Sequence, residues 1–306
     1  IRVVGVVTND GPKIAADVVI LECGGFESSA ELRQKHIGHN WDKAKVRGTP
    51  MNTGDGLAMA FEIGAQNYGL IDGCHATPMD LHMPDYANLD LPAGERKNYR
   101  KICYFLGVML NANGDRFVDE GENFRNYTYA QFGKAVLDQP GHFAWQIFDA
   151  KVDELLYAEY SFHDAHYVEA DTLVALCDQL DGVDSAAALA TLEQFNKAVN
   201  EEMSFDPTSL DRKNTTGLSL PKSNWAQKFD TPPFKAYPVT GGITFTYGGL
   251  KVSDTCEVLG VDDKPMRGLF AAGEMVGGVF FEGYPGGSGL TSGAVFGRCA
   301  GLGAAG

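Results

Sequence analysis

The sequence predicts an α/β protein in which one domain is interrupted by a second, inserted domain. Glycines are dense near both ends of the 306-residue chain and sparse in its middle. A chain of this length also accommodates two domains of ordinary size. We therefore expect residues 1–72 and 240–306 to form one α/β domain, and residues 73–239 to form an inserted α+β domain.

At the N-terminus, two extended stretches flank a turn. Ile1–Val7 and Ala15–Leu21 are apolar, and Asn9–Pro12 between them contains strong turn residues. This pattern predicts a β-hairpin that leads directly into Gly24 and Gly25. Paired glycines after an apolar strand predict a backbone that passes close to a flat ligand or into a tight helix start.

A helix is expected to begin near Gly56, because Leu57 and Phe61 lie at helical spacing and Thr53 or Asp55 is placed to cap it. Farther along the chain, charged and aromatic residues replace glycine. Amphipathic stretches lie at residues 148–156 and 186–199, as expected for the inserted domain.

The C-terminal part predicts a buried strand, an acidic residue and then a helix with a bare first turn. The strand leads to Gly273 and Glu274, and Gly286–Leu290 opens the helix. Such a turn brings backbone N–H groups against a planar ligand, and its dipole favours negative charge. A reduced flavin is planar and gains negative charge along one edge. Glu274 is suited to accept hydrogen bonds from ribityl hydroxyls.

The composition narrows the function classes. A net charge of −15 opposes binding to nucleic acid or to an anionic membrane surface, and no run of 18 apolar residues predicts a transmembrane segment. The six cysteines occur singly, without histidines at metal-ligand spacing, so we expect no metal site and a reducing, cytoplasmic location. The chain starts in a strand-like stretch without Met, which predicts a fragment cut within a domain.

Four motifs in order resemble those of the fumarate reductase and succinate dehydrogenase flavoprotein superfamily, with FAD-dependent tricarballylate dehydrogenases as the most similar branch. The motifs are Gly24–Phe26, Asn52–Gly56, Gly107–Glu120, and Gly268–Glu274 with the glycine-rich helix start after it. The resemblance implies an interrupted Rossmann-like FAD-binding domain with an inserted substrate-capping domain. The family places its GxGxxG element before residue 1, so we expect this chain alone to hold FAD weakly or not at all.

The resemblance also implies which residues contact the cofactor. They are Gly24, Gly25, Thr53, Gly54, Asp55, Gly273, Glu274, Gly286, Gly287, Ser288, Gly289 and Leu290.

The implied reaction is desaturation of a CH–CH bond next to a carboxylate, with the hydride passing to N5 of FAD. Tricarballylate, giving cis-aconitate, is the best substrate guess, because FRNYTYAQFG resembles that branch. Arg125 follows Glu120 within one residue of the family spacing and would be both catalytic and substrate-binding. A guanidinium clamps a carboxylate bidentately, although it is a poor base without a proton relay. A surface salt bridge is the alternative role for Arg125.

Four further residues are expected at the substrate. His75 matches a family histidine that binds a substrate carboxylate. Thr244 stands, with Phe245, where fumarate reductases have a histidine pair, and Tyr247 follows it; Tyr284 stands where they have an arginine. These departures argue against fumarate or succinate. The element YPGG, which begins at Tyr284, is similar to ketosteroid dehydrogenases, in which tyrosines act in proton transfer. Core packing is the alternative role for each tyrosine.

Several alternatives stay open at this point. A ketosteroid-dehydrogenase-like enzyme is the second enzyme hypothesis, and a non-catalytic fragment or binding module without FAD is the hypothesis from another class. The cationic stretch Arg96–Lys101 either receives substrate carboxylates or forms a solvated face. The electron acceptor is unknown. We also expect Gly24, Gly25, Glu274 and Ser288 to lie close together, and His75 and Arg125 to face one cleft.

Overall fold

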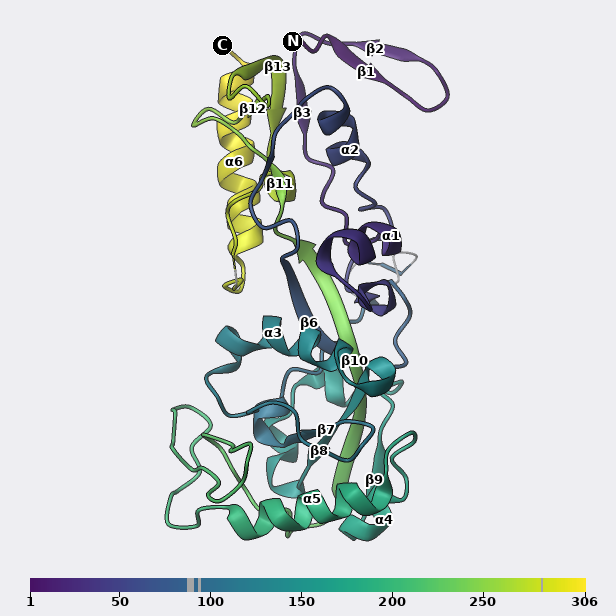
Figure 1. The fold of residues 1–306 in the computed structure, drawn as a ribbon, viewed down its shortest axis with the longest axis vertical. Coiled ribbons are helices and arrows are strands. Elements are labelled where there is room, and N and C mark those ends of the chain that lie inside the picture. The colour runs from purple at the N-terminus through teal and green to yellow at the C-terminus, as the bar shows by residue number, and fades with distance from the viewer. Residues whose placement is uncertain (87–90, 93–94, 282) are drawn as a thin grey trace. The chain divides into compact units, whose positions relative to one another are not determined.

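The computed structural model describes residues 1–86, 91–92, 95–281 and 283–306, which divide into two compact units (Figure 1). Unit 1 comprises Ile1–Asp42, Gly48–His75 and Thr244–Gly306, and unit 2 comprises Lys43–Arg47 and Ala76–Ile243. Both terminal parts of the chain thus belong to unit 1. Helices and sheets occur in both units, with parallel and antiparallel strand pairs, so the predicted mixed α/β class is confirmed.

Unit 1 is built around a small sheet that a long helix covers. β3 (Val19–Leu21) pairs in parallel with β13 (Pro265–Ala271), and β12 (Glu257–Leu259) pairs antiparallel on the other side of β13. Helix α6 (Ser288–Ala304) packs along β13 (Figure 1). Helix α2 (Asp55–Glu62) contributes Leu57 and Ala60 to the apolar core, and β5 (Asn67–Tyr68) pairs with β11 (Gly249–Leu250).

The N-terminal hairpin is shorter than the sequence predicts. β1 (Gly5–Val7) pairs antiparallel with β2 (Lys13–Ala15), and the turn residues lie between them as expected. The expected second strand, Ala15–Leu21, was wrong as one element. It divides near Asp17, because Val19–Leu21 gains hydrogen bonds from Leu269–Ala271 in a different sheet.

The cap of α2 also differs from the expectation. Neither Thr53 nor Asp55 caps the helix; the N-cap is Gly54, at φ 88° and with no side-chain capping bond. A Cβ on Gly54 would lie 2.6 Å from Leu32 Cδ1, so both its left-handed backbone and its packing require glycine. The Thr53 hydroxyl instead donates to Asp55 Oδ2 at 2.7 Å.

A run of short helical turns follows the Gly24–Gly25 strand end. Helix α1 (Ala30–Leu32) is capped by Ser29, whose Oγ accepts from Leu32 N, and continues as a π-helical turn at Arg33–Ile37. A 3₁₀ turn covers Trp41–Lys43, and another covers Gly273–Met275 after β13.

Unit 2 is built, among its described residues, on a six-stranded sheet around β10. The strands are β4 (Lys45–Val46), β6 (Cys74–Asp80), β7 (Val108–Leu110), β8 (Phe143–Phe148), β9 (Val168–Ala170) and β10 (Phe234–Thr246). β8 runs antiparallel to β10, from the pair Lys235 and Phe148 to the pair Thr240 and Phe143. β4 lies in the part of the sequence expected in the first domain, yet it pairs in parallel with Gly242–Ile243 of unit 2.

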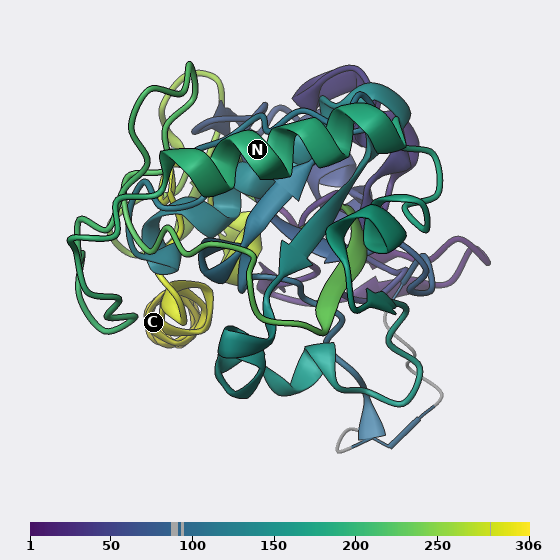
Figure 2. The ribbon, with the colours of Figure 1, turned by 90° about the horizontal axis from the view of Figure 1, so that it is seen from below.

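The helices of unit 2 are α3 (Arg125–Leu137), α4 (Leu173–Cys177) and α5 (Ser185–Ala198). Helix α5 crosses one face of the sheet (Figure 2), where Leu192 and Phe195 pack into a core with Ile147. Asp184 caps α5, since its Oδ1 accepts from Ala187 N at 2.9 Å, a contact worth about 1 kcal/mol. The other amphipathic stretch, residues 148–156, forms a 3₁₀ helix at Ala150–Leu155 rather than an α-helix.

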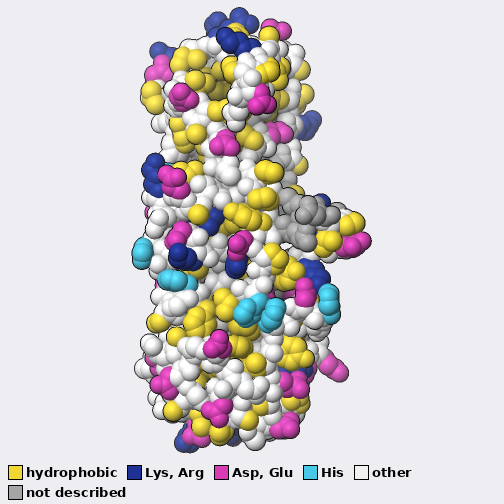
Figure 3. Space-filling model, turned by 90° about the vertical axis from the view of Figure 1, so that its right-hand side faces the viewer, with side chains coloured by type: hydrophobic (Ala, Val, Ile, Leu, Met, Phe, Trp, Pro, Cys, Tyr) yellow, Lys and Arg dark blue, Asp and Glu magenta, His cyan; other side chains and the backbone are white. Residues whose placement is uncertain are grey.

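The cationic stretch Arg96–Lys101 is engaged within unit 2. Lys97 pairs with Asp164 at 2.7 Å and Arg100 with Glu159 at 2.6 Å, while Lys101 is fully buried. Figure 3 shows histidine side chains gathered with acidic and basic ones on one face. These ion pairs join two segments of unit 2. Lys97 and Arg100 are therefore not available to bind substrate carboxylates.

Candidate active site

Two glycines at the end of β3 lie against side chains from the other end of the chain. A Cβ on Gly25 would fall 2.0 Å from Thr246 Oγ1 and 2.3 Å from Glu274 Oε1. Gly24 has φ 81°, and a Cβ there would lie 2.5 Å from Asn52 Cγ. The backbone therefore fits this site only as glycine at both positions.

Glu274 follows β13 at the start of a 3₁₀ turn and is held by Thr246. Its Oε1 accepts from Thr246 N at 2.7 Å and from Thr246 Oγ1 at 3.0 Å. Burial, followed by the adjacent Glu27 carboxyl, raises the pKa of Glu274 well above its ordinary value.

Sequence reasoning missed Glu27, which is 2% exposed and lies two residues after Gly25. Its Oε1 accepts from Asn52 Nδ2 at 2.5 Å, and its Oε2 is buried without a hydrogen-bond partner among the described residues. Asn52 was recognised as part of a motif but not as a site residue. The only local signal for Glu27 was its place directly after the Gly-Gly-Phe element.

The predicted cofactor residues on α2 lie beside the same strand end. A Cβ on Gly56 would meet Cys23 Sγ at 2.1 Å, and Gly54 lies against Phe26. Asp55 is the first residue of α2 and is exposed. The structure thus brings Thr53–Asp55 next to the Gly24–Gly25 turn.

The first turn of α6 is bare, as its sequence suggests. Gly287 is the N-cap, at φ 85°, and a Cβ on Gly286 or Gly287 would meet nothing within 4 Å. Leu290 is 85% exposed, and Ser288 Oγ donates to Pro285 O at 2.5 Å. This turn lines a cavity of about 460 Å³ together with Val279, Phe280, Thr291, Ser292, Val295 and Phe296.

Helix α6 also reaches the Glu274 region. A Cβ on Gly293, one turn into α6, would lie 4.0 Å from Gly273 Cα. Gly273, in turn, is left-handed at φ 66° and directly precedes Glu274.

Tyr284 links His75, which is buried, to a group of aromatic rings. The ring centroids of His75 and Tyr284 are 4.3 Å apart, and Tyr284 lies 5.5 Å from Phe245 and 4.9 Å from Phe280. The Tyr284 hydroxyl accepts from Gly289 N at 2.9 Å, which ties this group to α6. Tyr247 stacks near Phe280 at 5.6 Å.

Thr244 begins the last part of β10, next to Phe245 of this aromatic group. Its Oγ1 is buried with no hydrogen-bond partner among the described residues. A buried hydroxyl in this state is costly unless a ligand supplies a partner.

Arg125 lies in unit 2, as the first residue of α3. Its guanidinium lies 4.8 Å from the Tyr157 ring centroid, and no acidic side chain among the described residues pairs with it. It lines a cavity of about 420 Å³ with Phe105, Phe124, Asn126, Tyr127, Tyr157, Pro207, Thr208 and Trp225. An unpaired guanidinium held against a ring suits an anion. The shared cleft of His75 and Arg125 stays a prediction, because they belong to different units.

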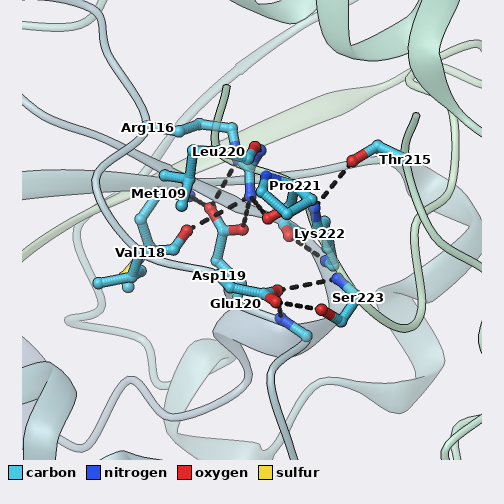
Figure 4. A network of polar contacts seen from close by, with 12 residues as sticks. Met109, Arg116, Val118, Asp119, Glu120, Thr215, Leu220, Pro221, Lys222 and Ser223 are labelled. Carbon is cyan, nitrogen blue, oxygen red and sulfur yellow. Dashed lines mark hydrogen bonds and ion pairs between the residues drawn. The ribbon is translucent and has the colours of Figure 1, made fainter. Parts of the chain in front are cut away.

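The end of the third motif, Arg116–Glu120, is structural (Figure 4). Glu120 is fully buried, binds Arg116 through both oxygens, and accepts from Met109 N at 2.8 Å. Lys222 Nζ donates to the carbonyls of Phe105 and Gly107. Burial lowers the pKa of Lys222 to about 8, although the Glu120 carboxylate acts in the opposite direction.

Two negative findings apply to the described part of the chain. It contains no group of three or more His, Cys, Asp or Glu side chains arranged to hold a metal ion. None of its helices is long and apolar enough to cross a membrane.

Comparison with known proteins finds a family model and several relatives. The family model described as FAD binding domain matches residues 2–290. A 4-oxocyclohexanecarboxylate 2-dehydrogenase of Sinomonas cyclohexanicum is 28% identical over 311 residues, covering 95% of this chain and 51% of that protein. The structure of an open flavocytochrome c3 fumarate reductase is 28% identical with a TM-score of 0.72, covering 99% of this chain and 51% of the other.

A second solved structure is similar to the same extent. The 3-ketosteroid Δ1-dehydrogenase of Sterolibacterium denitrificans, in complex with 1,4-androstadiene-3,17-dione, is 26% identical with a TM-score of 0.71, covering 99% of this chain and 57% of that one. The chain thus spans about half the length of the relatives that it matches.

Proposed function

The chain belongs to the FAD binding domain family, and from this premise we propose that it is part of an FAD-dependent oxidoreductase that desaturates a CH–CH bond next to a carboxylate. Named relatives are dehydrogenases and a fumarate reductase. The proposal also covers a cytoplasmic location, which the six free cysteines support.

One observation carries the cofactor part of the proposal. Gly25 leaves room for Glu274 and Thr246, which lie far from it in sequence, and the Cβ that would fill this space is absent. The orphaned Glu27 Oε2 and Thr244 Oγ1 lie in the same unit. Buried acceptors and a hydroxyl beside bare backbone fit the ribityl chain and ring of FAD. These features support FAD over the hypothesis of a binding module without it.

The residues would divide the work as follows. Bound FAD supplies a hydride acceptor at N5. Arg125 would clamp a substrate carboxylate and hold the adjacent carbon in place, because its guanidinium has no acidic partner among the described residues. Tyr284 would carry the proton, since its hydroxyl already binds the Gly289 backbone at the head of α6. His75, Thr244 and Tyr247 would bind the rest of the substrate.

Tricarballylate is the finer substrate candidate that we propose to test first. It rests on the FRNYTYAQFG sequence at Phe124–Gly133. A neutral or singly charged ring compound is the second candidate, because Tyr284 stacks near His75 in a group of aromatic rings and further rings line the cavity at Arg125. An aromatic lining favours an apolar ring over a small polycarboxylate.

A substrate panel under anaerobic conditions tests the proposal. The full-length protein, loaded with FAD, is mixed with tricarballylate, 4-oxocyclohexanecarboxylate, succinate and a 3-ketosteroid, and flavin absorbance is followed. Bleaching by tricarballylate alone supports the first candidate, and bleaching by the ring compounds alone supports the second. If no member of the panel bleaches the flavin, the proposed reaction is wrong.

A further inference from the structure

Glu27 was not predicted as a site residue, although it lies against two residues of the group around the glycine pair, Asn52 and Glu274. The residue is buried, its Oε1 accepts from Asn52 Nδ2, and the carboxyl of Glu274 lies beside its own. Asn52 packs beneath Gly24 and Glu274 packs beneath Gly25. Two acids and an amide therefore form one group under the glycine pair.

The hydrogen-bond inventory of this group lacks a donor. Glu274 Oε1 takes both donors of Thr246, and Asn52 serves Glu27 Oε1. Glu27 Oε2 has none among the described residues. Two neighbouring carboxylates cannot supply a donor to each other unless one of them is protonated.

The surrounding charge does not remove this deficit. The cation that faces the pair is Arg33, which is 3% exposed. Its nitrogens donate to the carbonyl oxygens of Glu27, Trp41 and Asp42. Arg33 therefore acts on the Glu27 carboxyl at a distance, and Thr246 supplies only neutral donors to Glu274.

We propose that Glu27 and Glu274 share one proton and that Glu27 is a positioning residue of the cofactor site. In this arrangement protonated Glu274 donates to Glu27 Oε2, while Asn52 holds Glu27 in place. A ribityl hydroxyl that donates to the pair can take over the place of the shared proton, so cofactor loading releases it. The second half of this inference rests on the proposed FAD site.

The shared proton determines the direction in which the stability of the fold changes with pH. Burial raises the pKa of both carboxyls. The stability that they contribute to the folded state is therefore fully present below the unfolded pKa near 4.3 and is lost as pH rises through the folded pKa. Retention of one extra proton in the folded state raises the unfolding equilibrium constant up to about tenfold per pH unit above about pH 5.

The first experiment follows urea unfolding of the 306-residue chain from pH 5 to pH 8, in wild type, Glu274→Gln and Glu27→Gln. In Glu274→Gln the amide donates permanently to Glu27, as the protonated acid does. We expect its unfolding equilibrium constant to rise less steeply with pH than that of wild type, by up to about tenfold per pH unit. Glu27→Gln should flatten this pH dependence in part, because burial still acts on Glu274.

Glu31→Gln is the matched control, since Glu31 is exposed in the adjacent helix. It should keep the wild-type dependence. A Glu274→Gln profile parallel to that of wild type overturns the shared proton, and near-ultraviolet circular dichroism confirms that each variant is folded.

The second experiment adds excess FAD to the full-length protein, in wild type and with the same substitutions, and measures the shift in thermal midpoint at pH 6 and pH 8. The wild-type shift should grow with pH, because loading releases a proton, and the Glu274→Gln shift should not. Equal shifts at both pH values in wild type, or no shift at all, overturn the link to the cofactor. The substrate panel is a separate measurement, so failure of the proposed reaction does not alter either result.

Discussion

Two buried groups of charged side chains, one in each unit, differ in whether their hydrogen bonds are complete. In unit 2, Glu120 is matched by Arg116, and the nitrogens of Arg116 and Lys222 all have acceptors (Figure 4). In unit 1, Glu27 and Glu274 face each other, and one oxygen lacks a donor. A network whose hydrogen bonds are complete serves the fold, whereas an incomplete one leaves room for a ligand or a proton.

The largest expected effect comes from a change in the network of Arg116, Glu120 and Lys222. Glu120→Ala leaves Arg116 and Lys222 buried without their carboxylate, so the free energy of unfolding should fall by about 3 to 5 kcal/mol. Urea denaturation measures this. Glu122→Ala, at an exposed position two residues away, should change it by less than about 0.5 kcal/mol. Equal losses in both variants would mean that the network contributes nothing special.

Arg125 supplies a contrast within unit 2, because this cation has no acidic partner among the described residues. Arg125→Ala should leave stability nearly unchanged but slow flavin reduction in the full-length protein by about 30- to 1000-fold, or about 2 to 4 kcal/mol. Arg125→Lys should restore little, because lysine lacks the planar fork. Wild-type reduction rates in both variants would assign Arg125 to a structural role.

Gly25→Ala tests how tightly unit 1 is packed around Glu27 and Glu274. The added Cβ would fall 2.0 Å from Thr246 Oγ1, so we expect a loss of about 1 to 3 kcal/mol and weaker FAD binding. Gly301→Ala is the control, because a Cβ in that turn of α6 meets nothing within 4 Å. It should stabilise by about 0.5 to 1 kcal/mol. A thermal midpoint that rises in Gly25→Ala contradicts the crowding.

The smallest effect compares the pH dependence of the two buried groups. The pKa of Lys222 is lowered to about 8, so between about pH 8 and 10 the folded state binds fewer protons than the unfolded state. Stability should therefore rise with pH in wild type relative to Lys222→Met, by up to about 1.4 kcal/mol per pH unit. The acid pair has the opposite slope at lower pH. A flat difference between wild type and Lys222→Met contradicts the lowered pKa.

The sequence sufficed to predict the α/β class and the flavoprotein family, because glycines at Gly24, Gly25 and Gly287 leave a local pattern. It could not predict that β3 leaves the hairpin for β13, or that β4 joins β10. Both pairings are parallel contacts between distant segments, and neither changes the local pattern of residues. The N-cap of α2 was missed because a left-handed glycine replaced the side-chain cap that composition favours.

The same limit applies to the candidate site. Glu274 stands in a recognisable motif, whereas Glu27 gains its meaning only from Asn52 and Glu274 in space. The cationic stretch Arg96–Lys101 suggested a substrate role until its partners Glu159 and Asp164 were known. Charge alone does not reveal whether a side chain is already neutralised.

The network of Figure 4 also bears on how unit 2 folds. Arg116 and the carbonyl of Leu220 are 104 positions apart in sequence, so their contact closes a long loop. The entropy cost of closing this loop is not offset by the contact until both segments have met. Until then Arg116, Glu120 and Lys222 are most stable in water, and a compact state that traps one of them without the others is unfavourable. We therefore expect these charges to be buried together and late in folding, so that the network disfavours misassembled intermediates.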